Sequence, residues 1–155
     1  MKKLFVISSA LLMFASCKKN DDASAQLEVT MANVAGLYKI TGDITVEGAV
    51  TYDNFNGGAT GAPSYPSDYD VCEKDDTYNF IVSGTVTKAE GATSCTPPSP
   101  SVSSSYVVQT SSKLINIPSF GLSGTIESLT SSTLVIKETS TVGGMASVHT
   151  VTLSK

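Results

Sequence analysis

The sequence predicts an all-β protein, a small eight-stranded antiparallel up-and-down barrel that follows a cleaved signal peptide. After an apolar N-terminal run, short segments rich in Val, Ile, Thr and Tyr alternate with segments rich in Gly, Ser and Pro, the composition of strands and turns. No long stretch shows helical periodicity. The 155 residues suffice for one domain. Closing many short strands into a barrel removes exposed sheet edges, which favours a barrel over an open sheet.

The N-terminal segment has the form of a secretory signal. Lys2 and Lys3 precede an apolar run over residues 4–16, which is too short to span a bilayer as a permanent helix. The end of this run, Phe14-Ala15-Ser16-Cys17, resembles the lipobox of bacterial lipoproteins, in which the cysteine is lipidated. We therefore expect a lipid anchor on Cys17. The alternatives are ordinary cleavage nearby with a free cysteine, and a retained anchor helix.

A lipid on Cys17 determines the expected location and partners. Lys18 follows it in place of the Asp that retains many lipoproteins in the inner membrane, so we expect the outer membrane, at its periplasmic face or at the cell surface. Cleavage removes two lysines and changes the formal charge from −4 to −6. Without a basic patch, nucleic acid is not an expected partner, and acyl chains provide the membrane contact. The predicted organisation is a signal peptide at 1–16, a lipid anchor and flexible linker at 17–31, and a barrel domain at 32–155.

The other two cysteines are expected to pair. An exported protein meets an oxidising compartment, and lipidation of Cys17 leaves only Cys72 and Cys95. By the chain-entropy estimate, such a disulfide is worth about 3 kcal/mol. The alternative is two unpaired thiols.

Alternation of apolar residues predicts the strands. In the first strand it places Tyr38, Ile40, Ile44 and Val46 on one face. The Gly- and Pro-rich loop that follows, residues 53–70, exceeds the usual connection length, so it is either functional or poorly ordered. The expected strands are residues 37–46, 77–82, 85–88, 105–110, 113–117, 124–129, 133–139 and 147–153.

The later strands are joined by short links. The strand at 77–82 places Tyr78, Phe80 and Val82 on one face, and Ser83-Gly84 is a hairpin turn signal before the next strand. A Pro-rich region then leads into five closely spaced strands, which we expect to form a meander.

Several segments resemble the lipocalin-like lipoprotein family. Residues 34–41, VAGLYKIT, are similar to its opening motif Leu-x-Gly-x-Trp-x-Leu, with Tyr38 in place of Trp. Residues 70–87 resemble its Cys-x-x-Asp-Asp-x-x-x-Phe-x-x-x-Gly segment, Cys95 supplies the second cysteine, and residues 128–138 resemble its Leu-x-x-x-x-Leu-x-Leu-Lys strand. The resemblance implies a lipocalin-like barrel in a secreted or outer-membrane lipoprotein. Because most members have no known ligand, it implies a fold more than a function.

An acidic run is the first candidate for chemistry. Five carboxylates lie within nine residues, but their spacing does not fit an EF-hand loop. We interpret the run as a solvated turn whose Asp side chains cap backbone N–H groups, with Ca²⁺ binding as the alternative. The residues are Asp68, Asp70, Glu73, Asp75 and Asp76.

Catalysis is not expected. His149 is the only histidine and shares a strand face with Val151 and Leu153, so we expect a packed, hydrogen-bonded residue and not a metal ligand. The segment GLSGT at 121–125 is not a nucleophile elbow, and no glycine-rich phosphate loop is present. We predict no catalytic residues, no metal and no cofactor.

Binding is the predicted function. An eight-stranded barrel is just wide enough to be filled by side chains or to hold one small ligand. We expect a monomer that holds a small apolar or amphipathic molecule at its mouth. The alternative is a packed barrel whose acidic loops contact another envelope protein or a glycan. The predicted cavity residues are Tyr38, Ile40, Ile44, Phe80, Tyr106 and Ile136.

Overall fold

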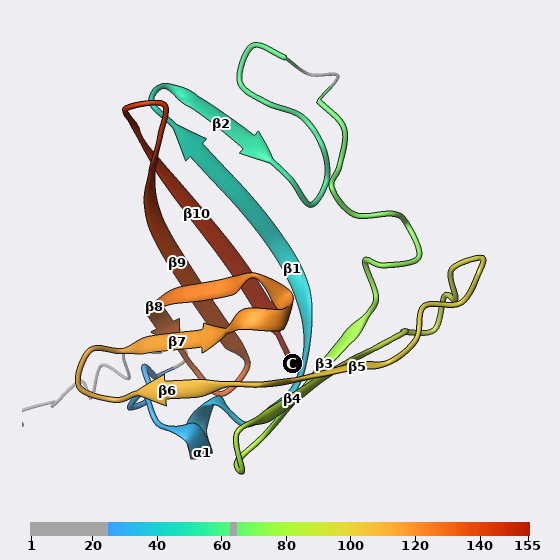
Figure 1. The fold of residues 1–155 in the computed structure, drawn as a ribbon, viewed down its shortest axis with the longest axis vertical. Coiled ribbons are helices and arrows are strands. Elements are labelled where there is room, and N and C mark those ends of the chain that lie inside the picture. Colours follow the sequence, from blue (N-terminus) through green and yellow to red (C-terminus); the bar gives the residue numbers. More distant parts are fainter. Residues whose placement is uncertain (1–24, 63–64) are drawn as a thin grey trace, which may run out of the picture.

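The fold is an antiparallel all-β sheet bent into a nearly closed barrel (Figure 1). The structure, a computed structural model, describes residues 25–62 and 65–155. The predicted signal peptide at 1–16 and the lipidation site Cys17 lie outside the described residues and stay predictions. Within the described ranges, no helix has the length and apolar character needed to cross a membrane.

Each predicted strand overlaps an observed strand, and the structure adds β2 before the long loop. The two helical elements, α1 and the 3₁₀ turn η1, are each a single turn. The strands are β1 (Gly36–Glu47), β2 (Val50–Asp53), β3 (Thr77–Ile81), β4 (Thr85–Ala89), β5 (Val102–Ser105), β6 (Val107–Gln109), β7 (Leu114–Ile117), β8 (Leu122–Leu129), β9 (Thr133–Val142) and β10 (Met145–Ser154), and the helical turns are α1 (Met31–Val34) and η1 (Pro118–Phe120).

The sheet nearly closes because one stretch of chain forms both of its ends. The strand order is β5-β4-β3-β1-β10-β9-β8-β7-β6, and β2 pairs with β1 outside this path. β5 and β6 stand at opposite ends of the path, yet only Tyr106 separates them in the chain. The path therefore has nine strands instead of the predicted eight. The predicted strand at 105–110 is divided at Tyr106, because the chain pairs with β4 before this residue and with β7 after it.

A β-bulge in β1 changes which side chains face inward. The pairing with β10 shifts register between Ile40 and Gly42. An inserted residue reverses the alternation beyond it. Asp43 is accordingly buried, whereas Ile44 is only half-buried. Ile44 therefore lies on the opposite face from the one predicted for it.

The other five predicted cavity residues are packed in the core. Tyr38, Ile40, Phe80, Tyr106 and Ile136 are at most 5% exposed. The Phe80 ring meets those of Tyr38 and Tyr106 edge-on, with centroids 5.6 and 5.1 Å apart. All five belong to one cluster of buried apolar residues, so this part of the barrel is filled by side chains.

The last residues of the predicted flexible linker also pack against the barrel. The Leu27 amide donates to the Leu129 carbonyl at 2.7 Å, and Val29 is 6% exposed. Burial of an aliphatic side chain and a backbone hydrogen bond hold this part of 17–31 against the sheet.

The Tyr38 hydroxyl is buried without a hydrogen-bond partner among the described residues. Burial raises the pKa of Tyr38 to about 12. Removing an unpaired buried hydroxyl removes a desolvation cost. We expect Tyr38→Phe to leave stability unchanged or raise it by about 1 kcal/mol in urea unfolding. Tyr106→Phe is the matched control, since the Tyr106 hydroxyl donates to the Ile81 carbonyl at 3.0 Å. It should lose stability, and an equal loss in both variants would contradict the prediction.

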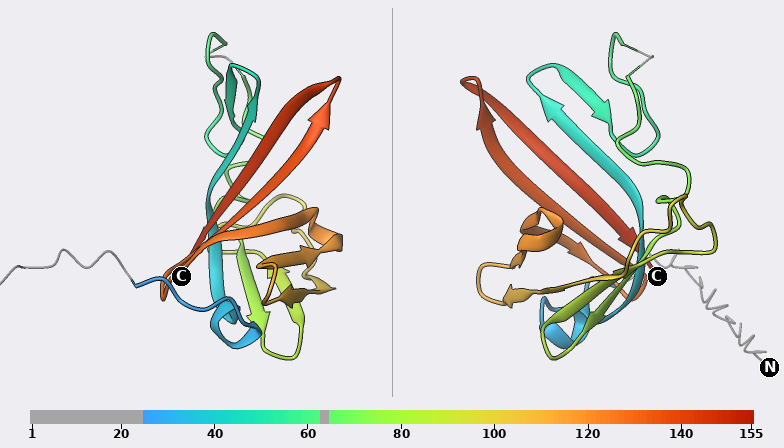
Figure 2. Two further views of the ribbon diagram at one scale, coloured as in Figure 1. Left: turned by 90° about the vertical axis from the view of Figure 1, so that its left-hand side faces the viewer. Right: turned by 45° about the vertical axis from the view of Figure 1, so that its right-hand side comes forward.

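One end of the barrel is open. β1 pairs with β3 at its beginning and with β2 at its end, while β10 follows it along its other edge. Figure 2 shows the β1–β2 and β9–β10 hairpins extending beyond the shorter strands. The inner face of this extension, with the loop after β2, forms what we call the mouth.

Candidate functional site

In the mouth, a buried carboxylate contacts three other side chains, so that three parts of the chain meet there. Asp43 comes from β1, His149 from β10, and Asn54 and Tyr69 from the loop after β2. Asp43 Oδ1 accepts from Asn54 Nδ2 at 2.8 Å and lies 2.8 Å from His149 Nε2. Asp43 Oδ2 accepts from the Tyr69 hydroxyl at 2.8 Å. We call these residues the Asp43 cluster.

The cluster fastens the long loop to the sheet. The Asn54 amide donates to the Asp43 carbonyl at 2.9 Å, and the Asp68 amide donates to the Asn54 carbonyl at 2.8 Å. Tyr69 also packs against Phe55, with ring centroids 5.4 Å apart. The described parts of the predicted 53–70 loop are therefore tied to β1 by hydrogen bonds on both sides of residues 63–64.

The contacts in the cluster determine its protonation. Burial opposes ionisation of Asp43, but hydrogen bonds from His149, Asn54 and Tyr69 outweigh it and hold its pKa below the ordinary value. The hydrogen bond to Asp43 raises the pKa of His149, although burial acts against this. Burial, followed by the hydrogen bond to Asp43, raises the pKa of Tyr69 far above its ordinary value. The Asp43 carboxylate is thus ionised and accepts, and the Tyr69 hydroxyl keeps its proton and donates to it. The predicted hydrogen bonding of His149 is confirmed.

These shifts predict a pH window of greatest stability. A raised His149 pKa contributes stability that is complete below about pH 6.5 and is lost as the pH rises through the folded-state pKa. A lowered Asp43 pKa contributes stability that is complete above about pH 4 and is lost as the pH falls through its folded-state pKa. Urea unfolding at a series of pH values should therefore show a plateau between about pH 4 and 6.5. His149→Gln should lack the decline on the alkaline side. An unchanged decline in that variant would assign it to another group.

A cleft of about 420 Å³ lies beside the cluster at the mouth. The rings of Tyr52 and Tyr65 meet on one side of it, with centroids 5.1 Å apart. Glu47 Oε1 accepts a long hydrogen bond of 3.4 Å from the Ser147 hydroxyl. We call it the mouth cleft; its lining residues are Thr45, Glu47, Tyr52, Asn54, Tyr65 and Asp68.

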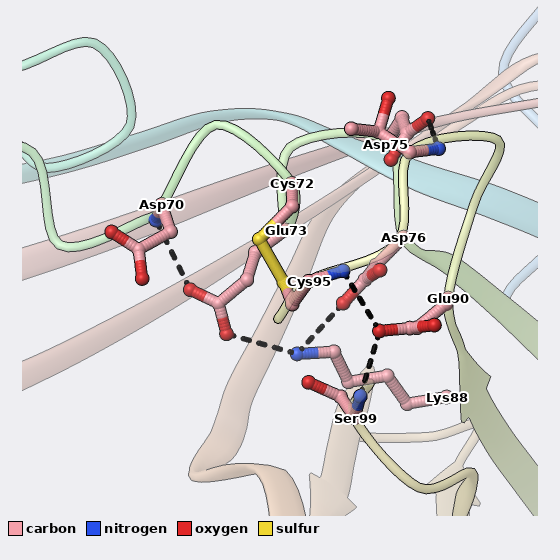
Figure 3. Close-up of a disulfide and its surroundings, with 10 residues drawn as sticks. Asp70, Cys72, Glu73, Asp75, Asp76, Lys88, Glu90, Cys95 and Ser99 are labelled. Atoms are coloured by element: carbon pink, nitrogen blue, oxygen red, sulfur yellow. Dashed lines mark hydrogen bonds and ion pairs between the residues drawn. A yellow bond between two sulfur atoms is a disulfide. The ribbon is translucent and has the colours of Figure 1, made fainter. Parts of the chain in front are cut away.

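The predicted disulfide between Cys72 and Cys95 is confirmed, with Cα atoms 5.2 Å apart (Figure 3). It joins the turn before β3 to the turn after β4. Beside it, the Lys88 ammonium lies 3.1 Å from Asp76 Oδ2 and 3.8 Å from Glu73 Oε1. The Asp76 side chain is only 2% exposed, so Lys88 supplies the counter-charge that a buried carboxylate needs.

Two of the five carboxylates of the acidic run, and the later Glu90, accept hydrogen bonds from backbone amides. Glu73 accepts from the Asp70 amide at 3.1 Å, and Asp75 accepts from the Thr93 amide at 2.9 Å. Glu90 Oε1 accepts from the amides of Cys95 and Ser99 at 3.1 and 2.7 Å. The predicted capping by Asp side chains is therefore found only at Asp75, and its partner Thr93 lies in a distant turn. Over residues 25–62 and 65–155, no three His, Cys, Asp or Glu side chains converge as metal ligands.

The residues that the sequence predicts as functional therefore do not form a single site. Tyr38, Phe80 and their partners are in the core, the cysteines lie at one edge, and only Asp68 of the acidic run reaches the mouth cleft. Sequence reasoning missed the Asp43 cluster, because it assumed an unbroken alternation through Gly42, where an isolated glycine can mark a bulge. The charged Asp43 within the apolar alternation of this strand was a further signal of a polar site.

By fold and site, the chain is a small disulfide-bonded, nearly closed antiparallel β-barrel with a polar cleft at its open end. No protein-family model, no curated protein and no solved structure matches it. Its class is therefore defined by its own geometry.

Proposed function

We propose that the protein is a lipid-anchored envelope lipoprotein with a lipocalin-like barrel that binds a small amphipathic molecule at its mouth. The mouth cleft is the observation that carries this proposal. Small-molecule sites are concave and combine apolar or aromatic surface with a few polar groups. The mouth cleft is concave and more polar than such sites usually are, with two tyrosine rings among four polar side chains. The meander of strands and the Cys72–Cys95 disulfide support the lipocalin-like part of the proposal.

The filled core favours binding at the mouth over binding deep in the barrel. The mouth cleft contains none of the six predicted cavity residues. A ligand in the lower barrel would have to displace side chains such as Phe80 and Ile136, which are 2% exposed. Displacement of packed core groups costs more than occupation of an existing cleft.

A bulkier side chain at Ile136 tests whether the barrel has spare volume. Ile136 pairs with Val151 on one side and Ile126 on the other, and all three are buried. We expect Ile136→Phe to lower the free energy of unfolding by about 1–3 kcal/mol, measured in urea. Val135→Phe, at the neighbouring position on the outer face, should change it far less. Stabilisation by Ile136→Phe would instead reveal a cavity and favour a deep apolar site.

Mass spectrometry of the protein extracted from its native membrane tests both parts of the proposal. Under denaturing conditions, we expect a chain that begins at Cys17 and carries acyl groups, and Cys17→Ala should abolish this species. Under native conditions, we expect a further mass that leaves on unfolding and is depleted in Tyr52→Ala. An unmodified N-terminus would contradict the anchor. A native mass equal to the denatured mass would contradict the binding function.

The alternative function is a packed module that contacts another envelope protein or a glycan. One observation favours it: a groove of about 440 Å³ on the outside of β6, β7 and β8. Val107 and Leu114 in this groove are 58% and 40% exposed. Cross-linking in intact cells, with the wild-type protein and with Leu114→Asp, tests whether this groove binds a partner. A partner lost in that variant would favour the interaction module.

A further inference from the structure

We propose that the mouth cleft is selective for a cationic head group, so that its ligand is an amphipathic amine or quaternary ammonium compound. This inference rests on the proposed function and names the ligand class for the same site.

The lining of the cleft carries two negative charges and no positive charge. Glu47 and Asp68 are both among the six lining residues, and no lysine is. Among the described residues, no ion pair involves either carboxylate. The adjacent Asp43 is already paired with His149. Two uncompensated carboxylates in a concave surface attract cations and repel anions.

The remaining charged groups near the mouth do not neutralise the cleft. The Lys74 ammonium lies 5.2 Å from the centre of the Phe55 ring, and it is not part of the lining. A protonated His149 balances only Asp43, with which it shares a 2.8 Å contact. Glu138, the cross-strand neighbour of His149, adds a further negative charge on this face.

The tyrosine rings supply a second kind of contact for a cation. Tyr52 and Tyr65 both line the cleft, and their ring planes are inclined by 56°. Because the two rings are inclined, their faces point in different directions. Aromatic faces attract ammonium groups, quaternary ones included, through the ring quadrupole. The rings also provide apolar surface for the adjoining hydrocarbon.

The hydrogen-bond donors of the lining are partly used within the protein. Both protons of the Asn54 amide group are directed away from a ligand, to Asp43 Oδ1 at 2.8 Å and to Thr45 Oγ1 at 2.9 Å. Its carbonyl oxygen, like the two carboxylates, can only accept. Acceptors therefore predominate in the lining, which fits a ligand that carries positive charge or N–H donors.

Three short amphiphiles with different head groups test the proposal. Butyltrimethylammonium, butyl β-glucoside and butyl sulfate have the same tail and are too short to form micelles at the concentrations used. Dissociation constants are measured by ligand-observed NMR with the lipid-anchored full chain in nanodiscs, and empty nanodiscs are the blank. We expect the ammonium probe to bind at least tenfold more tightly than the other two, and to bind more weakly as salt is raised.

Two matched variants locate the binding. Asp68→Asn and Asp70→Asn remove the same charge from exposed residues two positions apart, but only Asp68 lines the cleft. We expect Asp68→Asn to weaken ammonium binding at least fivefold and Asp70→Asn to leave it within twofold. Equal effects of the two substitutions would overturn the proposal, because the attraction would then come from net charge alone.

The outcomes separate this inference from the proposed function. Equal or tighter binding of the glucoside or the sulfate, reduced by Tyr52→Ala, would overturn the cationic class but retain ligand binding at the mouth. Ammonium binding that neither Asp68→Asn nor Tyr52→Ala reduces would overturn the cleft as its site. If none of the three probes binds the protein above the blank, both the cationic class and the proposed binding function fail.

Discussion

Replacement of Cys72 and Cys95 by serine will lower the free energy of unfolding by about 3 kcal/mol. The disulfide joins residues 23 positions apart, so its loss frees a sizeable loop in the unfolded chain. It also releases two turns from one another in the folded protein. Urea unfolding of the double variant against the oxidised wild-type protein measures the effect.

The reduced wild-type protein is the control for this prediction. Unfolded in the presence of a thiol reductant, it should match the double variant, since both lack the same bond. Hydrogen exchange should also increase at the amides of Cys95 and Ser99, which donate to Glu90. A loss below about 1 kcal/mol would show that the β3–β4 pairing and the Lys88–Asp76 ion pair hold these turns without the disulfide.

Asp43→Asn will lower the free energy of unfolding by about 2–4 kcal/mol. The carboxylate accepts from Asn54 and Tyr69, lies 2.8 Å from His149, and is only 9% exposed. An amide of the same shape keeps the volume but loses the charge and one acceptor atom. Its NH₂ group replaces an acceptor oxygen, so at least one of the groups that now contact the carboxylate must turn or lose its hydrogen bond. Urea unfolding near pH 6 measures the loss.

A double-mutant cycle isolates the contact between Asp43 and the loop. Tyr69→Phe removes only the hydroxyl that donates to Asp43 Oδ2. In the Asp43→Asn background its effect should fall markedly, because the two groups share one hydrogen bond. Asp70→Asn, at an exposed position, is the control and should change stability by less than about 0.5 kcal/mol. Full additivity of the two changes would contradict the proposed coupling.

Asp43→Asn should affect the mouth cleft as well as the stability of the fold. Asn54 belongs both to the Asp43 cluster and to the lining of the mouth cleft. Loosening the cluster should therefore increase hydrogen exchange at Asp68, whose amide donates to Asn54, and weaken binding at the cleft.

Local patterns in the sequence were sufficient to predict the strands and the disulfide. Alternation of apolar residues located the strands, and Ser83-Gly84 marked a hairpin that the structure contains, with Gly84 at a φ of 92°. Three cysteines and an export signal predicted the pairing of Cys72 with Cys95, which the structure confirms. These features depend on neighbouring residues or on simple counting, so a single sequence is enough to predict them.

Register and closure needed the tertiary structure. The bulge between Ile40 and Gly42 exchanged Ile44 for Asp43 on the inner face, and the isolated Gly42 was its only local signal. The division of one predicted strand into β5 and β6 follows from its pairing with β4 and β7 at opposite ends of the sheet. Both features result from contacts between segments that are distant in the chain.

The sequence by itself determined an all-β antiparallel chain, its strand positions and its disulfide, because alternation and cysteine content are local properties. Only the tertiary structure decided that the barrel core is filled and that the polar site lies at the mouth. Asp43 and His149 are 106 residues apart, and they meet because β1 and β10 are paired neighbours in the middle of the sheet. A one-residue change of register would have placed Asp43 on the outer face, so long-range pairing determined the site.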